Sequence, residues 1–186
     1  EHTYRAYPYL KSRLLHRKLN NFAYDPRRKE LYIFNLTKSG KIVGFQTRNL
    51  EGIGPKYKTW NLERIYNKLK IDLTDDKDEL DNLNKISMLF GILQVNMAIP
   101  FNIFEGPLDS LFMRNSIGLT GVKKAVLDFD EVPTSRYFFD NDSDGKRKMI
   151  QKLKEEQEVF MWSKFCEDYS IPTYGKKKVK DLNDLI

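Results

Sequence analysis

The stretch RYFFDNDSDGKRK, residues 136–148, decides the fold because its character changes twice within a short length. An aromatic run comes first, then Asp140, Asp142 and Asp144 at alternate positions, and then Gly145 and a basic run. The aromatic run is typical of a buried strand, and the residues after Gly145 favour a helix. Neighbouring like charges resist ionising together, so the aspartates indicate a cation or a cationic partner. The stretch therefore predicts a strand, a turn rich in carboxylates and a helix.

Short apolar strands and helical stretches alternate on both sides of this unit. Strands are expected at 101–106, 115–121, 136–140 and 159–165, and helices at 85–95, 107–113, 122–129 and 145–157. Such alternation predicts an α/β fold with a mostly parallel sheet flanked by helices. Parallel sheets bind ligands beyond the carboxyl ends of their strands. Glu105 and Asp140 each end an expected strand, so chemistry is expected there.

The first half of the chain has a different pattern and a different charge. Leucine spacing predicts a helix over 7–19, two apolar runs around a Ser-Gly turn predict a hairpin over 31–50, and helical spacing returns over 61–71. Residues 1–70 carry 16 Lys and Arg against 5 Asp and Glu, a net charge of +11, whereas the rest carries 16 against 21, a net of −5. We therefore expect a small basic α+β subdomain over 1–84 and a second domain over 85–186, and the basic surface indicates a polyanionic partner.

The composition excludes several classes of protein. Hydrophobic residues at 40% suffice for a packed core, so a disordered chain is not expected. Cys166 is the single cysteine, which excludes a disulfide framework and a cysteine-based zinc module within these residues and favours a reducing, intracellular setting. Neither a secretory signal nor an apolar run of membrane-spanning length is present, so no membrane partner is expected. His2 and His16 adjoin no nucleophile, which argues against a hydrolase triad.

The acidic run admits three interpretations. DNDSDG fits the first six positions of a calcium-binding EF-hand loop, but Gln151 stands where that loop needs a glutamate, and a strand-like segment precedes it instead of a helix. A magnesium site fits better, because Asp140 and Asp142 can project toward one ion with Glu105 from a neighbouring strand. Asp109 lies one helical turn beyond Glu105 and can join them. A solvated loop that caps the following helix stays open for the aspartates taken alone.

The order of IFEGPLDSL (103–111), NSIGLTG (115–121), YFFDNDSDGKRK (137–148) and KDLNDLI (180–186) resembles the TOPRIM domain of bacterial-type primases, type IA and II topoisomerases and some nucleases. The resemblance implies catalytic roles for Glu105, Asp140 and Asp142 with Mg²⁺ or Mn²⁺. It implies metal ligands or their outer support at these three residues and at Asp109, Asp144 and Asp181. Asn183 stands where bacterial primases carry a second aspartate.

The segment KSGKIVGFQTRNLEGIGPKYKTW (38–60) resembles the amino-terminal part of primase cores, with Arg48, Lys56 and Tyr57 at the matching positions. With Lys58 and Lys146, these residues are expected to hold nucleic acid or nucleotide. Trp60 fits either base stacking or packing. The motifs FEGPLDSLF, FDND and KDLND look closest to primases of large tailed phages.

This resemblance implies the RNA-polymerizing core of a phage-like DNA primase, which makes short RNA primers on single-stranded DNA by metal-dependent nucleotidyl transfer. The implied partners are single-stranded DNA template, ribonucleoside triphosphates and a replicative helicase. A monomer in the cytoplasm of a bacterium or a phage-infected host is expected. The alternatives are another TOPRIM activity, such as a nuclease or topoisomerase-like strand cleavage, and a non-catalytic DNA-binding module.

Overall fold

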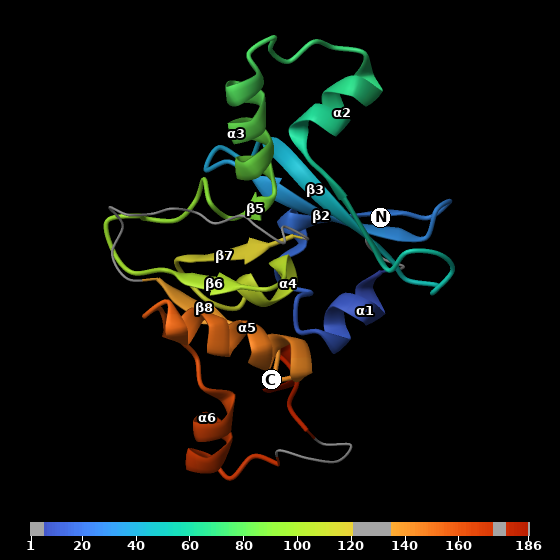
Figure 1. Cartoon of the computed structure of the whole chain (residues 1–186). Coiled ribbons are helices and arrows are strands. Elements are labelled where there is room, and N and C mark those ends of the chain that lie inside the picture. Colours follow the sequence, from blue (N-terminus) through green and yellow to red (C-terminus); the bar gives the residue numbers. More distant parts are fainter. Residues whose placement is uncertain (1–5, 121–134, 173–177, 186) are drawn as a thin grey trace. The chain divides into compact units, whose positions relative to one another are not determined.

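The computed structural model describes residues 6–120, 135–172 and 178–185 (Figure 1). The chain divides into two compact units. The first unit comprises Glu1–Gln94 and Leu119–Leu127, and the second comprises Val95–Gly118 and Asp128–Ile186. The boundary expected between residues 84 and 85 stays a prediction.

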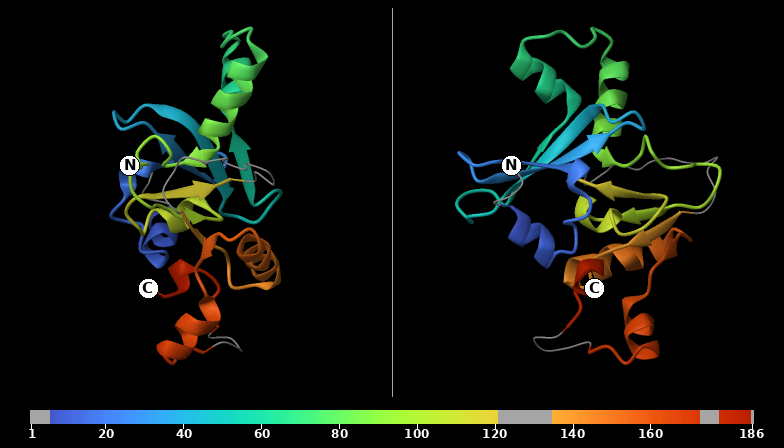
Figure 2. Two further views of the ribbon diagram at one scale, coloured as in Figure 1. Left: turned by 60° about the vertical axis from the view of Figure 1, so that its left-hand side comes forward. Right: turned by 180° about the vertical axis from the view of Figure 1, so that it is seen from behind.

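The first unit is built on an antiparallel sheet with the strand order β1-β2-β3-β4. The strands are β1 (Phe22–Asp25), β2 (Glu30–Leu36), β3 (Ile42–Asn49) and β4 (Tyr57–Trp60). The expected hairpin is confirmed as β2 and β3, and its turn contains Gly40 at a φ of 80°, a conformation that glycine adopts without strain. Helices α2 (Leu62–Leu69) and α3 (Lys77–Ser87) pack against each other (Figure 2). The expected helix over 61–71 is thus confirmed as α2, which Asn61 caps by accepting the Arg64 N–H.

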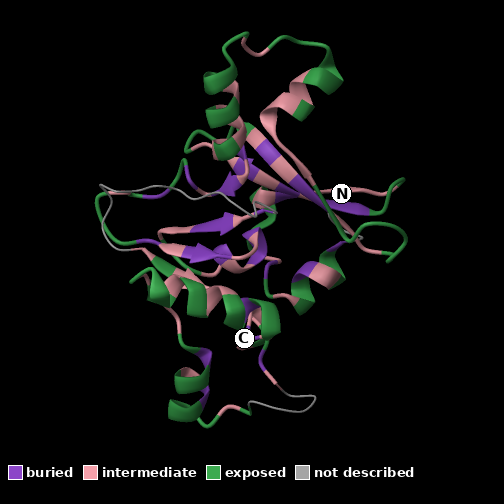
Figure 3. Cartoon of the chain, viewed as in Figure 1, coloured by how far each residue is buried: buried purple, intermediate pink, exposed green. Residues whose placement is uncertain are grey.

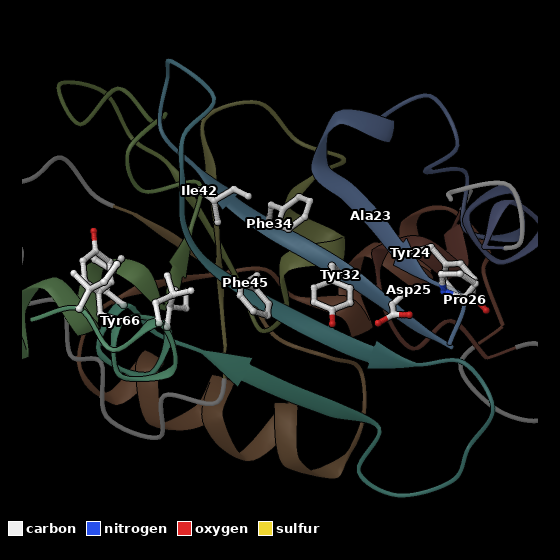
Figure 4. Close-up of a pocket in the computed structure, with 13 residues that line it drawn as sticks. Ala23, Tyr24, Asp25, Pro26, Tyr32, Phe34, Ile42, Phe45 and Tyr66 are labelled. Carbon is white, nitrogen blue, oxygen red and sulfur yellow. The ribbon is translucent and has the colours of Figure 1, made fainter. Parts of the chain in front are cut away.

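The two faces of this sheet differ because side chains alternate along each strand. One face carries Leu31 and Ile33, which are buried (Figure 3). The other face carries a row of aromatic rings, in which the ring centroids of Tyr32 and Phe45 lie 5.4 Å apart and those of Phe45 and Trp60 lie 5.5 Å apart. A pocket of about 730 Å³ opens over this second face, and side chains of β1, β2, β3 and α2 line it (Figure 4).

The helix expected over 7–19 is shorter than predicted. Helix α1 spans only Tyr7–Ser12, and a 3-10 helix, η1, spans Leu19–Asn21. The chain reverses at Leu14, whose φ is 54°, and the Leu15 N–H then donates to the Leu10 carbonyl at 2.8 Å. This turn keeps Leu10 and Leu15 buried without a continuous helix, which is why the leucine spacing was misleading.

The helix expected over 85–95 is wrong, because α3 ends at Ser87 and a short strand, β5 (Leu89–Phe90), follows. The fully buried Asn35 side chain explains the difference. Its amide donates to the carbonyls of Ser87 at 3.0 Å and Leu89 at 3.1 Å, and its oxygen accepts the Gly91 N–H at 3.2 Å. In a continuous helix these backbone groups would bond to one another. Here Asn35, more than fifty positions away in sequence, bonds to them instead, so the segment after Ser87 is not helical.

The second unit contains a parallel arrangement of strands. Strands β7 (Ser116–Leu119), β6 (Asn102–Phe104), β8 (Arg136–Phe138) and β9 (Glu158–Val159) lie next to one another in that order. Strand β6 pairs in parallel with β7 and β8, and β8 pairs in parallel with β9. The helices are α4 (Pro107–Ser110), α5 (Ser143–Lys154), α6 (Trp162–Asp168) and the 3-10 helix η2 (Leu182–Leu185). The predicted α/β fold with a mostly parallel sheet flanked by helices is therefore confirmed.

The strand expected over 159–165 is wrong beyond Val159, since α6 begins at Trp162. Trp162 and Cys166, one helical turn apart, are buried together with Val179. The Trp162 indole also donates to the Phe139 carbonyl at 2.6 Å, which fixes the start of α6 beneath β8. The helix expected over 122–129 lies outside the described residues. None of the described helices is long and apolar enough to cross a membrane.

Candidate active site

Glu105 and Asp140 meet because they follow two adjacent parallel strands at the same edge of the sheet. Phe104, the last residue of β6, pairs with Phe138, the last residue of β8. Glu105 follows directly, and the Asp140 N–H donates to the Glu105 Oε2 at 2.9 Å. Ligand sites of parallel sheets lie at such carboxyl ends. The topology therefore brings together two of the three predicted catalytic residues.

The turn after β8 is held by Asp142 and Gly145. Asp142 caps α5, because its Oδ1 accepts the N–H groups of Gly145 at 3.0 Å and Asp144 at 3.1 Å. A Cβ atom on residue 145 would lie only 1.9 Å from the Asp140 carbonyl oxygen. Glycine is therefore needed there so that α5 can start close against the carboxylate turn.

The carboxyl groups of Asp140 and Asp142 have opposite pKa shifts. Burial, followed by the charge of Glu105, raises the pKa of Asp140 above its usual value. The Gly145 N–H contributes most to the lowered pKa of Asp142. Asp142 is thus a stable anion, whereas Asp140 carries its negative charge at a cost, which a nearby cation would reduce.

Two lysines link the carboxylates in pairs. The Lys180 Nζ lies 3.4 Å from the Asp140 Oδ2 and 3.3 Å from the Asp142 Oδ2. The Lys148 Nζ contacts the Glu105 Oε1 and lies 2.7 Å from the Asp144 Oδ2. The sequence interpretation missed both lysines. The spacing of four residues between Asp144 and Lys148 on a helix was a usable signal, whereas nothing local to Lys180 points to Asp140.

A lysine-rich run such as the one that ends at Lys180 is typical of a solvated loop, but its described part, 178–180, is held in place. Val179 is buried, and its carbonyl accepts from the Asn141 side chain at 2.9 Å. The Asn141 N–H donates to the Lys180 carbonyl at 2.5 Å. The backbone is therefore fixed beside the carboxylate turn, which is why the Lys180 ammonium reaches it.

The remaining predicted residues of the second unit are Asp109, Lys146 and Asp181. The charge of Asp181 contributes to the raised pKa of Asp140, which places it near that carboxyl group. Asp109 lies in the first turn of α4, and one of its oxygens is buried. Lys146 is exposed on α5. The outer metal support expected of Asp109 and Asp181 and the nucleotide contact expected of Lys146 stay predictions.

The carboxylates of this cluster are donors of the type that suits a divalent metal. Within 6–120, 135–172 and 178–185, no three Asp, Glu, His or Cys side chains converge so as to hold a metal ion. Glu105, Asp140 and Asp142 nevertheless offer oxygen ligands of the type that Mg²⁺ and Mn²⁺ prefer. The ammonium groups of Lys148 and Lys180 contact carboxylate oxygens of these three residues, as a bound metal cation would.

In the first unit, Arg48 lies between two aromatic rings. Its guanidinium carbon is 4.8 Å from the Tyr9 ring centroid and 4.9 Å from that of Tyr57, and its Nη1 donates to the Tyr57 hydroxyl. The Arg48 Nε is buried and has no hydrogen-bond partner among the described residues. The Lys56 Nζ lies 5.7 Å from the Tyr57 ring centroid. Three of the predicted binding residues are therefore brought together.

Lys58 and Trp60 have other surroundings. Arg48 pairs with Tyr57 in the sheet register, so Lys58, the next residue, points to the opposite face. There its Nζ lies 3.0 Å from the Oε1 of the buried Glu30. Trp60 stacks on Phe45 and lies under the Arg64 guanidinium, 4.1 Å from its carbon, which favours packing over base stacking.

No protein-family model matches this chain, and no curated protein matches it in sequence. Three solved structures with similar folds are primases. A DNA primase domain from Pseudomonas aeruginosa is 20% identical with a TM-score of 0.47, over 70% of this chain and 39% of that one. The zinc-binding and RNA polymerase domains of the Aquifex aeolicus primase are 16% identical with a TM-score of 0.45, over 84% and 43% of the two chains. A DnaG primase catalytic domain bound to single-stranded DNA is 16% identical with a TM-score of 0.42, over 77% and 44%. The matches thus span less than half of each of these structures.

Proposed function

We propose that this chain is the catalytic core of a DNA primase of the phage type, which synthesises short RNA primers on single-stranded DNA. The observation that carries the proposal is the meeting of Glu105 with the Asp140–Asp142 turn at the ends of β6 and β8, where the Asp140 N–H donates to Glu105 at 2.9 Å. The sequence motifs around these residues resemble those of primases. A solvated capping loop explains the Asp142 contacts but gives no reason for Glu105 and Asp140 to lie together.

The reaction would be the attack of a primer 3′-hydroxyl on the α-phosphate of an incoming ribonucleotide, with pyrophosphate as the leaving group. Asp140, Asp142 and Glu105 would hold a divalent ion, with Asp109, Asp144 and Asp181 as outer support. When bound, that ion would lower the pKa of the attacking hydroxyl and offset charge on the leaving group. Glu105, whose carboxylate lies beside Asp140 at the end of β6, would also serve as an acid–base group.

The first unit would bind the template or the triphosphate. Arg48 is held between two aromatic rings, and its guanidinium offers a fork of donors of the kind that contacts a phosphate. Lys56 and Tyr57 adjoin it, and we assign all three to phosphate and base contacts. We also propose that a replicative helicase is a partner of this protein and that it acts in the cytoplasm of a bacterium or an infected host.

The test is to incubate the chain with single-stranded DNA, four ribonucleoside triphosphates and Mg²⁺ or Mn²⁺, and to separate the labelled products by length. New oligoribonucleotides that disappear with Asp140→Asn support the proposal. Shortened DNA would indicate a nuclease, and a nick that reseals would indicate a topoisomerase-like activity. DNA binding without any product would indicate a non-catalytic module. Each of the last three outcomes contradicts a primase.

A further inference from the structure

Two lysines offset part of the negative charge of four carboxylates at the candidate active site, and each lysine bridges two of them. Lys180 joins Asp140 to Asp142, and Lys148 joins Glu105 to Asp144. The bridged pairs include all three residues proposed to hold the metal. The oxygen atoms contacted are Oδ2 of both Asp140 and Asp142 and Oε1 of Glu105.

We infer that Lys148 and Lys180 are exchangeable counter-ions, which hold the carboxylates in place without metal and give up their positions when a divalent cation binds. The inference rests on the metal site of the proposed function. A divalent ion needs direct contact with carboxylate oxygens. An ammonium group 3.3–3.4 Å from the same oxygens takes up that space and opposes a second cation by its charge.

The structure lets the side chain of Lys180 move while its backbone stays fixed. The Lys180 carbonyl accepts from the Asn141 N–H, and the Lys180 N–H donates to the Asp184 Oδ2 at 2.8 Å. The Lys180 side chain is 54% exposed and the Lys148 side chain is 39% exposed. A lysine stem has several rotatable bonds. Each ammonium can therefore leave the carboxylates without unfolding the turn or α5.

After the exchange, the two ammonium groups remain tethered beside the metal, and the triphosphate of a nucleotide is the anion that would attract them. Lysine commonly binds phosphate as a point charge. The lysines should therefore oppose binding of the metal alone and support binding of a triphosphate with metal. A lysine that only stabilises the fold would not give effects of opposite sign.

The experiment measures Mn²⁺ binding by electron paramagnetic resonance in the full chain at fixed pH. Removing one positive charge at about 4 Å should tighten Mn²⁺ binding by up to about thirtyfold in Lys180→Met, given the Coulomb energy of a single charge and a divalent ion in water. Lys148→Met should act in the same direction, and Lys180→Arg should stay near the parent protein. Lys164→Met is the matched control, because it removes the same charge from α6, where Lys164 pairs with Asp168. It should change the affinity less than about twofold, as an exposed pair contributes little.

A second measurement uses a non-hydrolysable ribonucleoside triphosphate at saturating Mn²⁺, where Lys180→Met should bind more weakly than the parent protein. Circular dichroism confirms that each variant is folded. If the parent binds Mn²⁺ and both Lys→Met variants bind it equally well, the counter-ion role is wrong while the metal site stands. If neither the parent nor any variant binds Mn²⁺, the metal site and the proposed function fail together.

Discussion

At the scale of single residues, Glu105 accepts hydrogen bonds from Asp140 and Lys148, both of which are distant from Glu105 in sequence. We predict that Glu105→Gln keeps the fold, because a glutamine oxygen can still accept the Asp140 N–H. Primer synthesis should fall by about 10²-fold or more, as expected when an acid–base or metal-bound group is lost. The measurement compares initial rates of primer synthesis and melting temperatures.

Glu158→Gln is the matched control for this substitution. Glu158 lies in the same unit and pairs with Arg136 at 2.7 Å, but both side chains are largely exposed. It should leave primer synthesis almost unchanged. Synthesis by Glu105→Gln at the rate of the control would remove Glu105 from the mechanism.

Asp25 gives a residue-scale prediction on pH. Its Oδ1 accepts the N–H of Arg27 at 2.8 Å and of Arg28 at 3.2 Å, and these bonds hold its pKa below the ordinary value of 3.8. A lowered pKa in the folded state stabilises the fold above the ordinary value, and this contribution is lost as the pH falls through the folded pKa. We predict that Asp25→Ala is less stable than the parent at neutral pH, and that the difference shrinks below pH 3.8.

Asp25→Asn provides the comparison, since its side-chain oxygen can accept the same bonds but cannot titrate near this pH. Its stability relative to the parent should change with pH, while its turn stays intact. Urea unfolding at several pH values measures all three proteins. A difference between parent and Asp25→Ala that is constant from neutral to acidic pH would refute the prediction.

At the scale of elements, the position of α5 depends on Gly145. A Cβ there would clash with the Asp140 carbonyl oxygen, so Gly145→Ala must push α5 away from the turn. We predict a loss of about 1–3 kcal/mol in the free energy of unfolding, as for other overpacked sites. Weaker Mn²⁺ binding should accompany it, because Asp142 caps the same helix.

Gly106→Ala is the control at element scale. The nearest atom to a Cβ on residue 106 is the Asp109 Oδ2 at 3.9 Å, which is an ordinary contact. Its effect on stability should stay within about 0.5 kcal/mol. Equal stability of the two variants, measured by denaturant unfolding, would show that the close approach of α5 to Asp140 is not required.

At the scale of the whole molecule, the charge of residues 1–70, +11, should dominate DNA binding. Contacts to phosphates read no bases, so affinity for single-stranded DNA should fall steeply with salt and vary little with template sequence. Arg48→Ala and Lys56→Ala should each weaken binding to all templates and reduce the slope of log affinity against log salt by about 0.7, the share of one phosphate on a single strand. Salt titrations by fluorescence anisotropy on unrelated oligonucleotides measure this.

Lys68→Ala is the corresponding control, because Lys68 is an exposed lysine of α2 and no binding role is assigned to it. It should change the slope much less than Arg48→Ala. A strong preference for one short sequence that persists at high salt would contradict the prediction and indicate base-specific recognition within the chain.

Local patterns in the sequence were sufficient for the hairpin β2–β3, helix α2, the strand–turn–helix unit around Asp140 and the α/β class. Each depends on near neighbours: alternation along a strand, a capping Asn61 or Asp142, or a glycine at a turn. The juxtaposition of Glu105 with Asp140 also followed, once the two strands were taken as parallel neighbours. The roles of these side chains remain proposals.

Only the tertiary structure decided which charges meet. Lys180 reaches Asp140 because Asn141 binds the backbone of 179–180, and Lys148 reaches Glu105 because α5 starts close against the turn. Asn35 likewise keeps the segment after α3 from continuing as a helix, because its side chain binds the carbonyls of Ser87 and Leu89. Lys58 turns away from Arg48 because β3 and β4 pair in one register. These contacts join residues distant in sequence or depend on strand pairing. They form only when the whole fold is assembled, so no local sequence pattern predicts them.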